Sequence, residues 1–144
     1  MKDFIETRII TAVRGLLSGR VNEILGKCEF LLPVIEFGEV GVNYAVSPVL
    51  SLSGCERTEK ERVVRQDAFS LSITFTLPED EKGELYCYAY SAAFDKALSE
   101  DITLGSVADR AIVINKKFVP SKKPNCGEGW ALILSLRITV EEIG

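Results

Sequence analysis

The residues that most often carry enzyme chemistry are sparse in this chain. It contains no histidine, which excludes Ser–His and Cys–His nucleophile pairs and every histidine-ligated zinc site. No C-x2-C pair and no glycine-rich phosphate loop after a predicted strand is present. The cysteines, predicted to be reduced core thiols, are Cys28, Cys55, Cys87 and Cys126. The sequence predicts a protein that is not an enzyme and uses no cofactor or metal.

Carboxylates are the remaining candidates for acid–base chemistry or magnesium binding. They are the pairs Glu56 with Glu61 and Glu100 with Asp101, and the cluster Glu79, Asp80, Glu81 and Glu84. A catalytic carboxyl needs an apolar pocket that raises its pKa, whereas both pairs lie in charged or loop segments. The cluster follows Pro78 and suits the first turn of a helix, where carboxylates favour the positive end of the dipole. Solvated surface and helix capping are the favoured interpretations.

Residues 56–67, here called the charged arm, carry charges of both signs. The members are Glu56, Arg57, Glu59, Lys60, Glu61, Arg62, Arg65 and Asp67. Two valines are the only core-forming residues of the charged arm, so it is predicted to be a hairpin tip in solvent. The alternative is an interlocking contact with a neighbouring subunit through complementary charge. Both interpretations stay open.

Residues 110–123, here called the basic strip, contain no acidic residue. The cations are Arg110, Lys116, Lys117, Lys122 and Lys123. They suit either a phosphate backbone or an acidic partner surface. The favoured interpretation is a solvated hairpin whose lysines protect a strand edge from unwanted pairing.

The clearest strand covers residues 69–77, where large apolar residues alternate with small hydroxylated ones. Successive side chains of a strand point to opposite faces, so one face is core. The other face carries Ser70, Ser72, Thr74 and Thr76, and is here called the hydroxylated face. A second strong alternation, over residues 130–141, predicts the closing strand of the same sheet.

The remaining elements follow from periodicity and breakers. Apolar residues three or four apart predict a helix over residues 3–26, and an acidic start followed by small residues predicts another to about residue 99. Short strands are expected near residues 34–37 and 44–55, the latter at a sheet edge or starting after Pro48. A further strand is expected over residues 108–119. The fold class is therefore α+β, a mostly antiparallel four- to five-stranded sheet with two helices on one face.

Composition sets wider limits. The length of 144 residues and the 47% hydrophobic content favour one domain with its own core. A net charge of −4 argues against sequence-independent binding to DNA or to an anionic membrane. Charged residues near the start interrupt any secretory apolar region, and no stretch approaches the roughly 20 apolar residues that span a bilayer. We expect a soluble cytoplasmic protein.

The second half of the chain resembles the tail terminator (minor tail) proteins of long-tailed phages and prophages. The resemblance covers roughly the last half: the strand FSLSITF, the acidic-start helix, and the segment ALSEDITLGSVAD before the final hairpin. In that family a helix leads through a "TLGG" turn into the last hairpin. Here the turn is Thr103-Leu104-Gly105-Ser106, so serine replaces the second glycine.

The resemblance implies a structural protein with no catalytic residue. Such a protein forms a ring, expected to be a homo-hexamer, that caps the tail tube, stops its polymerisation and offers a surface to head-completion proteins. Its partners are then other copies of itself, the tail tube protein and a head-completion protein, with DNA only as a passive contact in the lumen and no membrane. Its place is the virion tail, after assembly in the bacterial cytoplasm. The charged arm, the hydroxylated face and the basic strip become candidate contact or lumen surfaces.

Two alternatives remain. One is a different head–tail connector or tail-completion protein of similar size and symmetry. The other, from another class, is a domain that binds a small molecule between the helices and the sheet, in a cavity lined by Tyr86, Cys87, Tyr88 and Tyr90. No convergent polar group accompanies these tyrosines in the sequence, and aromatic residues at helical spacing more often belong to a core.

Overall fold

The computed structural model describes residues 4–27, 34–35, 45–46, 48–59, 64–77, 83–122 and 128–143. In chain order the elements are α1 (Ile5–Leu16), the π-helical segment η1 (Leu17–Val21), α2 (Asn22–Leu25), β1 (Val34–Ile35), β2 (Ala45–Val46), β3 (Val49–Glu59), β4 (Val64–Leu77), α3 (Gly83–Glu100), β5 (Arg110–Lys122) and β6 (Glu128–Ile143).

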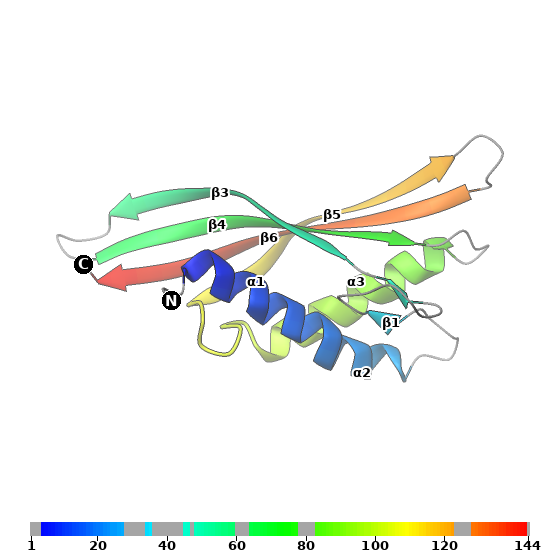
Figure 1. Ribbon diagram of the computed structural model, residues 1–144, viewed down its shortest axis with the longest axis horizontal. Helices are drawn as coiled ribbons and strands as arrows, with labels where there is room; N and C mark the ends of the chain where they lie inside the picture. The colour runs from blue at the N-terminus through cyan, green and yellow to red at the C-terminus, as the bar shows by residue number, and fades with distance from the viewer. Residues whose placement is uncertain are drawn as a thin grey trace.

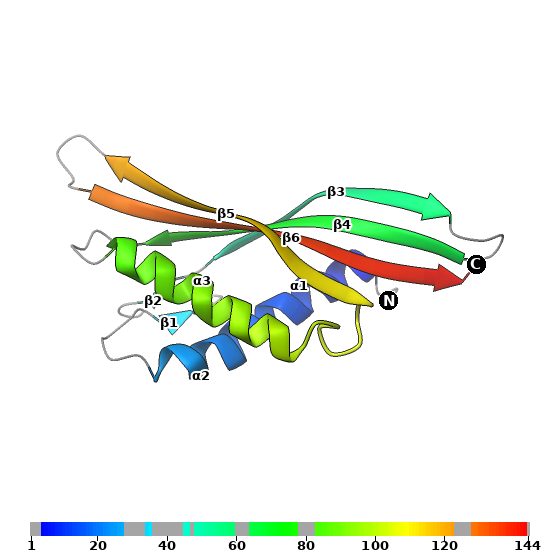
Figure 2. The same cartoon turned by 180° about the vertical axis from the view of Figure 1, so that it is seen from behind.

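A four-stranded antiparallel sheet in the order β3-β4-β6-β5 forms one layer of the molecule. The helices lie together against one face of this sheet (Figures 1 and 2). The predicted α+β class is therefore confirmed, with four strands in the main sheet. Strands β1 and β2 do not extend it, because they pair with each other in parallel.

The first helix is continuous over α1, η1 and α2 but contains a π-helical turn that periodicity did not predict. Its buried stripe is Ile9, Val13, Leu17, Val21 and Leu25. Each step in this stripe is four residues, and this spacing fits an α-helical turn as well as a π-helical turn, so the apolar pattern did not reveal the π turn. Just after the turn, Asn22 binds β1: its Oδ1 accepts from the Ile35 N–H at 2.9 Å and its Nδ2 donates to the Ile35 carbonyl at 2.8 Å. The side chain thus substitutes for a neighbouring strand.

The core lies between the sheet and the helices. The alternation predicted for β4 and β6 is confirmed: Phe69, Leu71, Ile73, Phe75, Leu77, Leu132, Leu134, Leu136, Ile138 and Val140 are buried. From α3, Tyr90 and Phe94 are fully buried, and the Tyr90 ring stacks on Phe75 with centroids 5.4 Å apart. The small residues of α3, such as Ala93 and Ala97, allow its close approach to the sheet.

The strand boundaries correct several predictions. Most of the charged arm is strand, because β3 continues to Glu59 and β4 begins at Val64. Strand β5 extends through Pro120 to Lys122, where a loop was expected. Proline is tolerated there because β5 is an edge strand, whose outward side needs no ladder hydrogen bond. Pro48 precedes β3, the other edge strand, as predicted.

Candidate assembly surfaces

The described part of the charged arm is held by an ion pair. Arg57 Nε and Nη2 donate to Asp67 Oδ1 and Oδ2 at 2.7 and 3.0 Å across the β3–β4 ladder. Asp67 is only 3% exposed, so its placement in a solvated tip was wrong. Hydrogen bonds from Arg57, with help from the Arg65 charge, lower the pKa of the Asp67 carboxyl.

The other members of the arm that the structure describes flank this pair. Glu59 is exposed and lies opposite Arg65, which is half-buried. Lys60, Glu61 and Arg62 lie outside the described residues.

The hydroxylated face is open in the described structure. Ser70, Ser72 and Thr74 lie opposite Arg137, Ser135 and Ile133 of β6. On the other side they lie opposite Gly54, Ser51 and Val49 of β3. Directly opposed residues share a face of the sheet, so this surface, on the side away from the helices, combines hydroxyls and small residues with Arg137, Ile133 and Val49.

The basic strip divides between the two faces of β5. Lys116 lies opposite the buried Leu134, on the helix side, and is paired with Asp95 of α3. Lys117 lies opposite Ile133 and therefore belongs to the hydroxylated face. Lys122 is the last residue of β5, and its side chain and Lys123 lie outside the described residues. The described part of the strip lies on an edge strand, a position that fits both interpretations of its lysines.

An exposed apolar cluster beside β5 was missed from the sequence. It consists of Tyr88 and Phe118, which are 46% and 37% exposed, and Leu85, 44% exposed, precedes Tyr88 by three residues on α3. The Tyr88 and Phe118 rings meet edge to face with centroids 5.2 Å apart. A hydrogen bond to Glu84 raises the pKa of the Tyr88 hydroxyl. The residue types alone did not separate these aromatics from the buried Tyr86 and Tyr90 of the same helix.

A hollow beside β3 was also missed. It has a volume of about 490 Å³ and lies between the start of α1 and the β3–β4 ladder. Its lining includes Ile5, Glu6, Leu52, Cys55, Arg57 and Phe69. Cys55 is exposed here, so its prediction as a core thiol was wrong. The hollow forms because α1 packs against the β3–β4 ladder, and neither α1 nor the ladder carries a sequence motif that predicts it.

The turn that carries the family resemblance adopts a left-handed backbone. Leu104, Gly105 and Ser106 have φ values of 52°, 66° and 70°. Asp101 holds this conformation by accepting from the Gly105 N–H at 3.0 Å, while Thr103 Oγ1 accepts from the Ser106 N–H at 3.3 Å. Non-glycine residues rarely adopt such angles, so the turn is strained and held by its surroundings.

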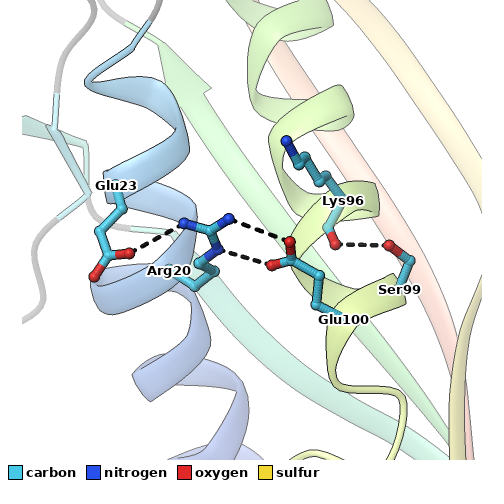
Figure 3. Close-up of polar contacts among 5 residues, drawn as sticks. All are labelled: Arg20, Glu23, Lys96, Ser99 and Glu100. Carbon is cyan, nitrogen blue, oxygen red and sulfur yellow. Dashed lines mark hydrogen bonds and ion pairs between the residues drawn. The ribbon is translucent and has the colours of Figure 1, made fainter.

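Of the two carboxylate pairs considered for chemistry, only Glu100 with Asp101 is described in full, and these two carboxylates accept hydrogen bonds from different donors. Glu100 accepts two hydrogen bonds from Arg20 of η1, at 2.7 and 3.2 Å, and Glu23 accepts a third at 3.2 Å (Figure 3). The bonds from Arg20 lower the pKa of Glu100 rather than raising it. Glu61 and the acidic cluster, except Glu84, lie outside the described residues.

The four residues proposed to line a cavity on α3 differ in burial. Tyr86, Cys87 and Tyr90 are buried in the core, and only Tyr88 is exposed. Burial raises the pKa of the Cys87 thiol to about 11, so this thiol is a poor nucleophile at neutral pH. In the described ranges no group of three His, Cys, Asp or Glu residues is placed to hold a metal ion. No described helix is long and apolar enough to cross a membrane.

Comparison with known proteins adds no relative: the sequence matches none of the protein-family models, and no curated protein matches it either.

Proposed function

We propose that this protein is a structural component of a phage or prophage tail, resembling tail terminators. It forms a ring on the end of the tail tube, stops tube polymerisation and presents a joining surface to the head. The observation that carries the proposal is the layered shape of the molecule. A long sheet is covered by helices on one face, whereas its hydroxylated face and its two outer edges are open in the described structure (Figures 1 and 2).

Two further features support a structural role. Several of the ionised side chains described above form ion pairs between elements, as in Arg57 with Asp67 and Arg20 with Glu100. Such pairs lower carboxyl pKa values and suit fixed architecture better than proton transfer. In addition, much of the exposed apolar surface gathers at one sheet edge, as is common at contacts between subunits.

The test is self-association of the purified protein. Light scattering over a concentration series, followed by negative-stain microscopy of the most concentrated sample, is expected to show closed rings. Incubation with isolated tail tubes is expected to place one ring at a tube end. Protein that remains monomeric throughout and does not sediment with tubes would contradict the proposal.

A different head–tail connector remains the alternative within the same class. Such a connector would form rings and bind head-completion proteins but would not bind the bare tube. The tube-binding experiment therefore separates a connector from a tail terminator.

A further inference from the structure

The two outer strands of the main sheet are long and open. Strand β3 lies at one edge and β5 at the other, and among the described residues no strand lies outside either. The described loop after α3 lies beside the start of β5, where the Ala111 N–H donates to the Ile102 carbonyl at 2.7 Å. Unpaired main-chain N–H and C=O groups on an edge are a template for pairing with another chain, so proteins usually protect them.

The edge at β5 exposes apolar side chains in addition to its lysines. The described residues contain eight large apolar side chains that are exposed, and five lie on or beside β5. These are Tyr88, Ile102, Ile114, Phe118 and Val119: three belong to β5, Tyr88 contacts Phe118, and Ile102 lies beside the start of the strand. Phe118 pairs in register with the buried Leu132, so the aromatic part of this surface lies on the helix side of the edge.

The edge at β3 offers a recess on the same side. Leu52 and Cys55 pair with Leu71 and Phe69, which are buried against the helices, so the hollow of about 490 Å³ opens on the helix side of β3. One edge thus carries an apolar protrusion, and the opposite edge has a recess in which Leu52 and Phe69 lie beside the ion pair of Arg57 and Asp67. Contacts between two different patches of the same molecule are heterologous and produce rings or open filaments.

Charge and strand direction agree with this contact. Strand β3 carries Glu56 and Glu59 beside Arg57, which is paired with Asp67. The charged residues of β5 are all cations: Arg110, Lys117, Lys122, and Lys116, which is paired with Asp95. The acidic and basic excesses attract each other and favour the β3–β5 pair over two β5 edges. Because the four strands alternate in direction, β5 of one copy beside β3 of a similarly oriented copy continues the antiparallel pattern.

We propose that the β5 edge of one copy pairs antiparallel with the β3 edge of a second copy, with the Tyr88–Phe118 cluster entering the hollow lined by Leu52 and Cys55. The inference rests on the proposed function in taking a second copy as the partner. It assigns the subunit contact to the edges and leaves the hydroxylated face uncovered by neighbours.

The test uses one variant at each edge. Phe118→Glu places a charge in the apolar cluster, and Cys55→Arg fills the hollow and repels the basic strand. Each is expected to weaken self-association roughly 30-fold or more, because buried aromatic anchors dominate interface energy. Ser18→Glu, which adds a carboxylate at an exposed position of the first helix outside both edges, is the control.

Mixing the two variants gives the sharpest result. Each retains one intact edge, so an equimolar mixture is expected to form a dimer of twice 15.9 kDa and nothing larger. This complementation also shows that both variants are folded. A mixture that stays monomeric while wild-type protein assembles overturns the edge pairing.

Cross-linking tests the same contact in assembled protein. In a variant whose other native cysteines are replaced, Phe118→Cys is expected to form a disulfide with Cys55 of the next copy on mild oxidation. Thr76→Cys, on the open face of the central strand β4, is the control and is expected to form none. If both edge variants assemble as strongly as wild-type protein, the edge contact is overturned but the proposed function is not. If wild-type protein never assembles, even with tail tubes, the proposed function is overturned as well.

Discussion

At the scale of single residues, the ion pair of Arg57 and Asp67 shows how the charged arm is used. Asp67 is a buried carboxylate whose two oxygens both accept from one guanidinium. Such a group stabilises the fold only while it is ionised and paired. The pair also forms part of the wall of the hollow beside β3, so it positions a surface as well as stabilising a ladder.

Replacing Arg57 by alanine is expected to lower the free energy of unfolding by about 1–3 kcal/mol at neutral pH, because it leaves a buried carboxylate without its donors. The lowered pKa of Asp67 stabilises the folded protein above the ordinary value of 3.8, and this contribution is lost as pH falls through the folded-state pKa. Urea titrations between neutral pH and about pH 2 measure both effects. Asp67→Asn should remove the part of the stability that is lost at low pH. Glu59→Ala, at an exposed position, is the control.

The left-handed turn yields a prediction with opposite signs at adjacent residues. Ser106 is exposed and has a φ of 70°, so Ser106→Gly is expected to stabilise the protein by up to about 1 kcal/mol through relief of strain. Gly105→Ala is expected to destabilise it by a similar amount, because its φ is 66°. Thermal unfolding of the two variants checks this. Equal effects would show that the turn relaxes to another conformation.

At the scale of elements, two glycines on helices have opposite surroundings. A Cβ added to Gly15 would meet nothing within 4 Å, whereas one added to Gly83 would lie 2.7 Å from Trp130 Cδ1. Gly15→Ala is therefore expected to stabilise the protein by about 1 kcal/mol through helix propensity. Gly83→Ala is expected to destabilise it, because the indole ring must shift. Chemical denaturation measures both, and a destabilising Gly15→Ala would show that the outer face of α1 is not free in solution.

The sequence was sufficient where one alternation controls burial. Strands β4 and β6 were predicted because a strand with one covered face must alternate, and that pattern also placed Ser70, Ser72 and Thr74 away from the core. The π turn was not predictable, since buried residues four apart fit either helix type. Asp67 of the charged arm was misplaced because its charge suits a loop, while its burial depends on Arg57, a partner ten residues away.

The candidate surfaces were predictable only in part. Residue types identified the hydroxylated face and the basic strip, because each is a run within one strand. The apolar cluster and the hollow combine residues far apart in the chain, such as Tyr88 with Phe118 and Ile5 with Leu52. Their meeting depends on how α3 and α1 pack on the sheet, which no local pattern encodes.

At the scale of the whole molecule, the strands extend beyond the helices at both ends (Figures 1 and 2). The joined ends of β3 and β4 project at one end, and those of β5 and β6 project at the other. A ring built by joining β3 and β5 edges would therefore present different elements above and below. That asymmetry suits a protein that we propose binds a tube on one side and a head-completion protein on the other.

The most direct test is the length of tail tubes assembled in its presence. Tube protein from the same phage or prophage is polymerised with and without this protein, and tube lengths and ends are recorded by negative-stain microscopy. The account predicts that addition of this protein arrests growth, with a ring visible at one end of each arrested tube, and that Phe118→Glu fails to arrest it. Tubes of unchanged length with bare ends would contradict the account.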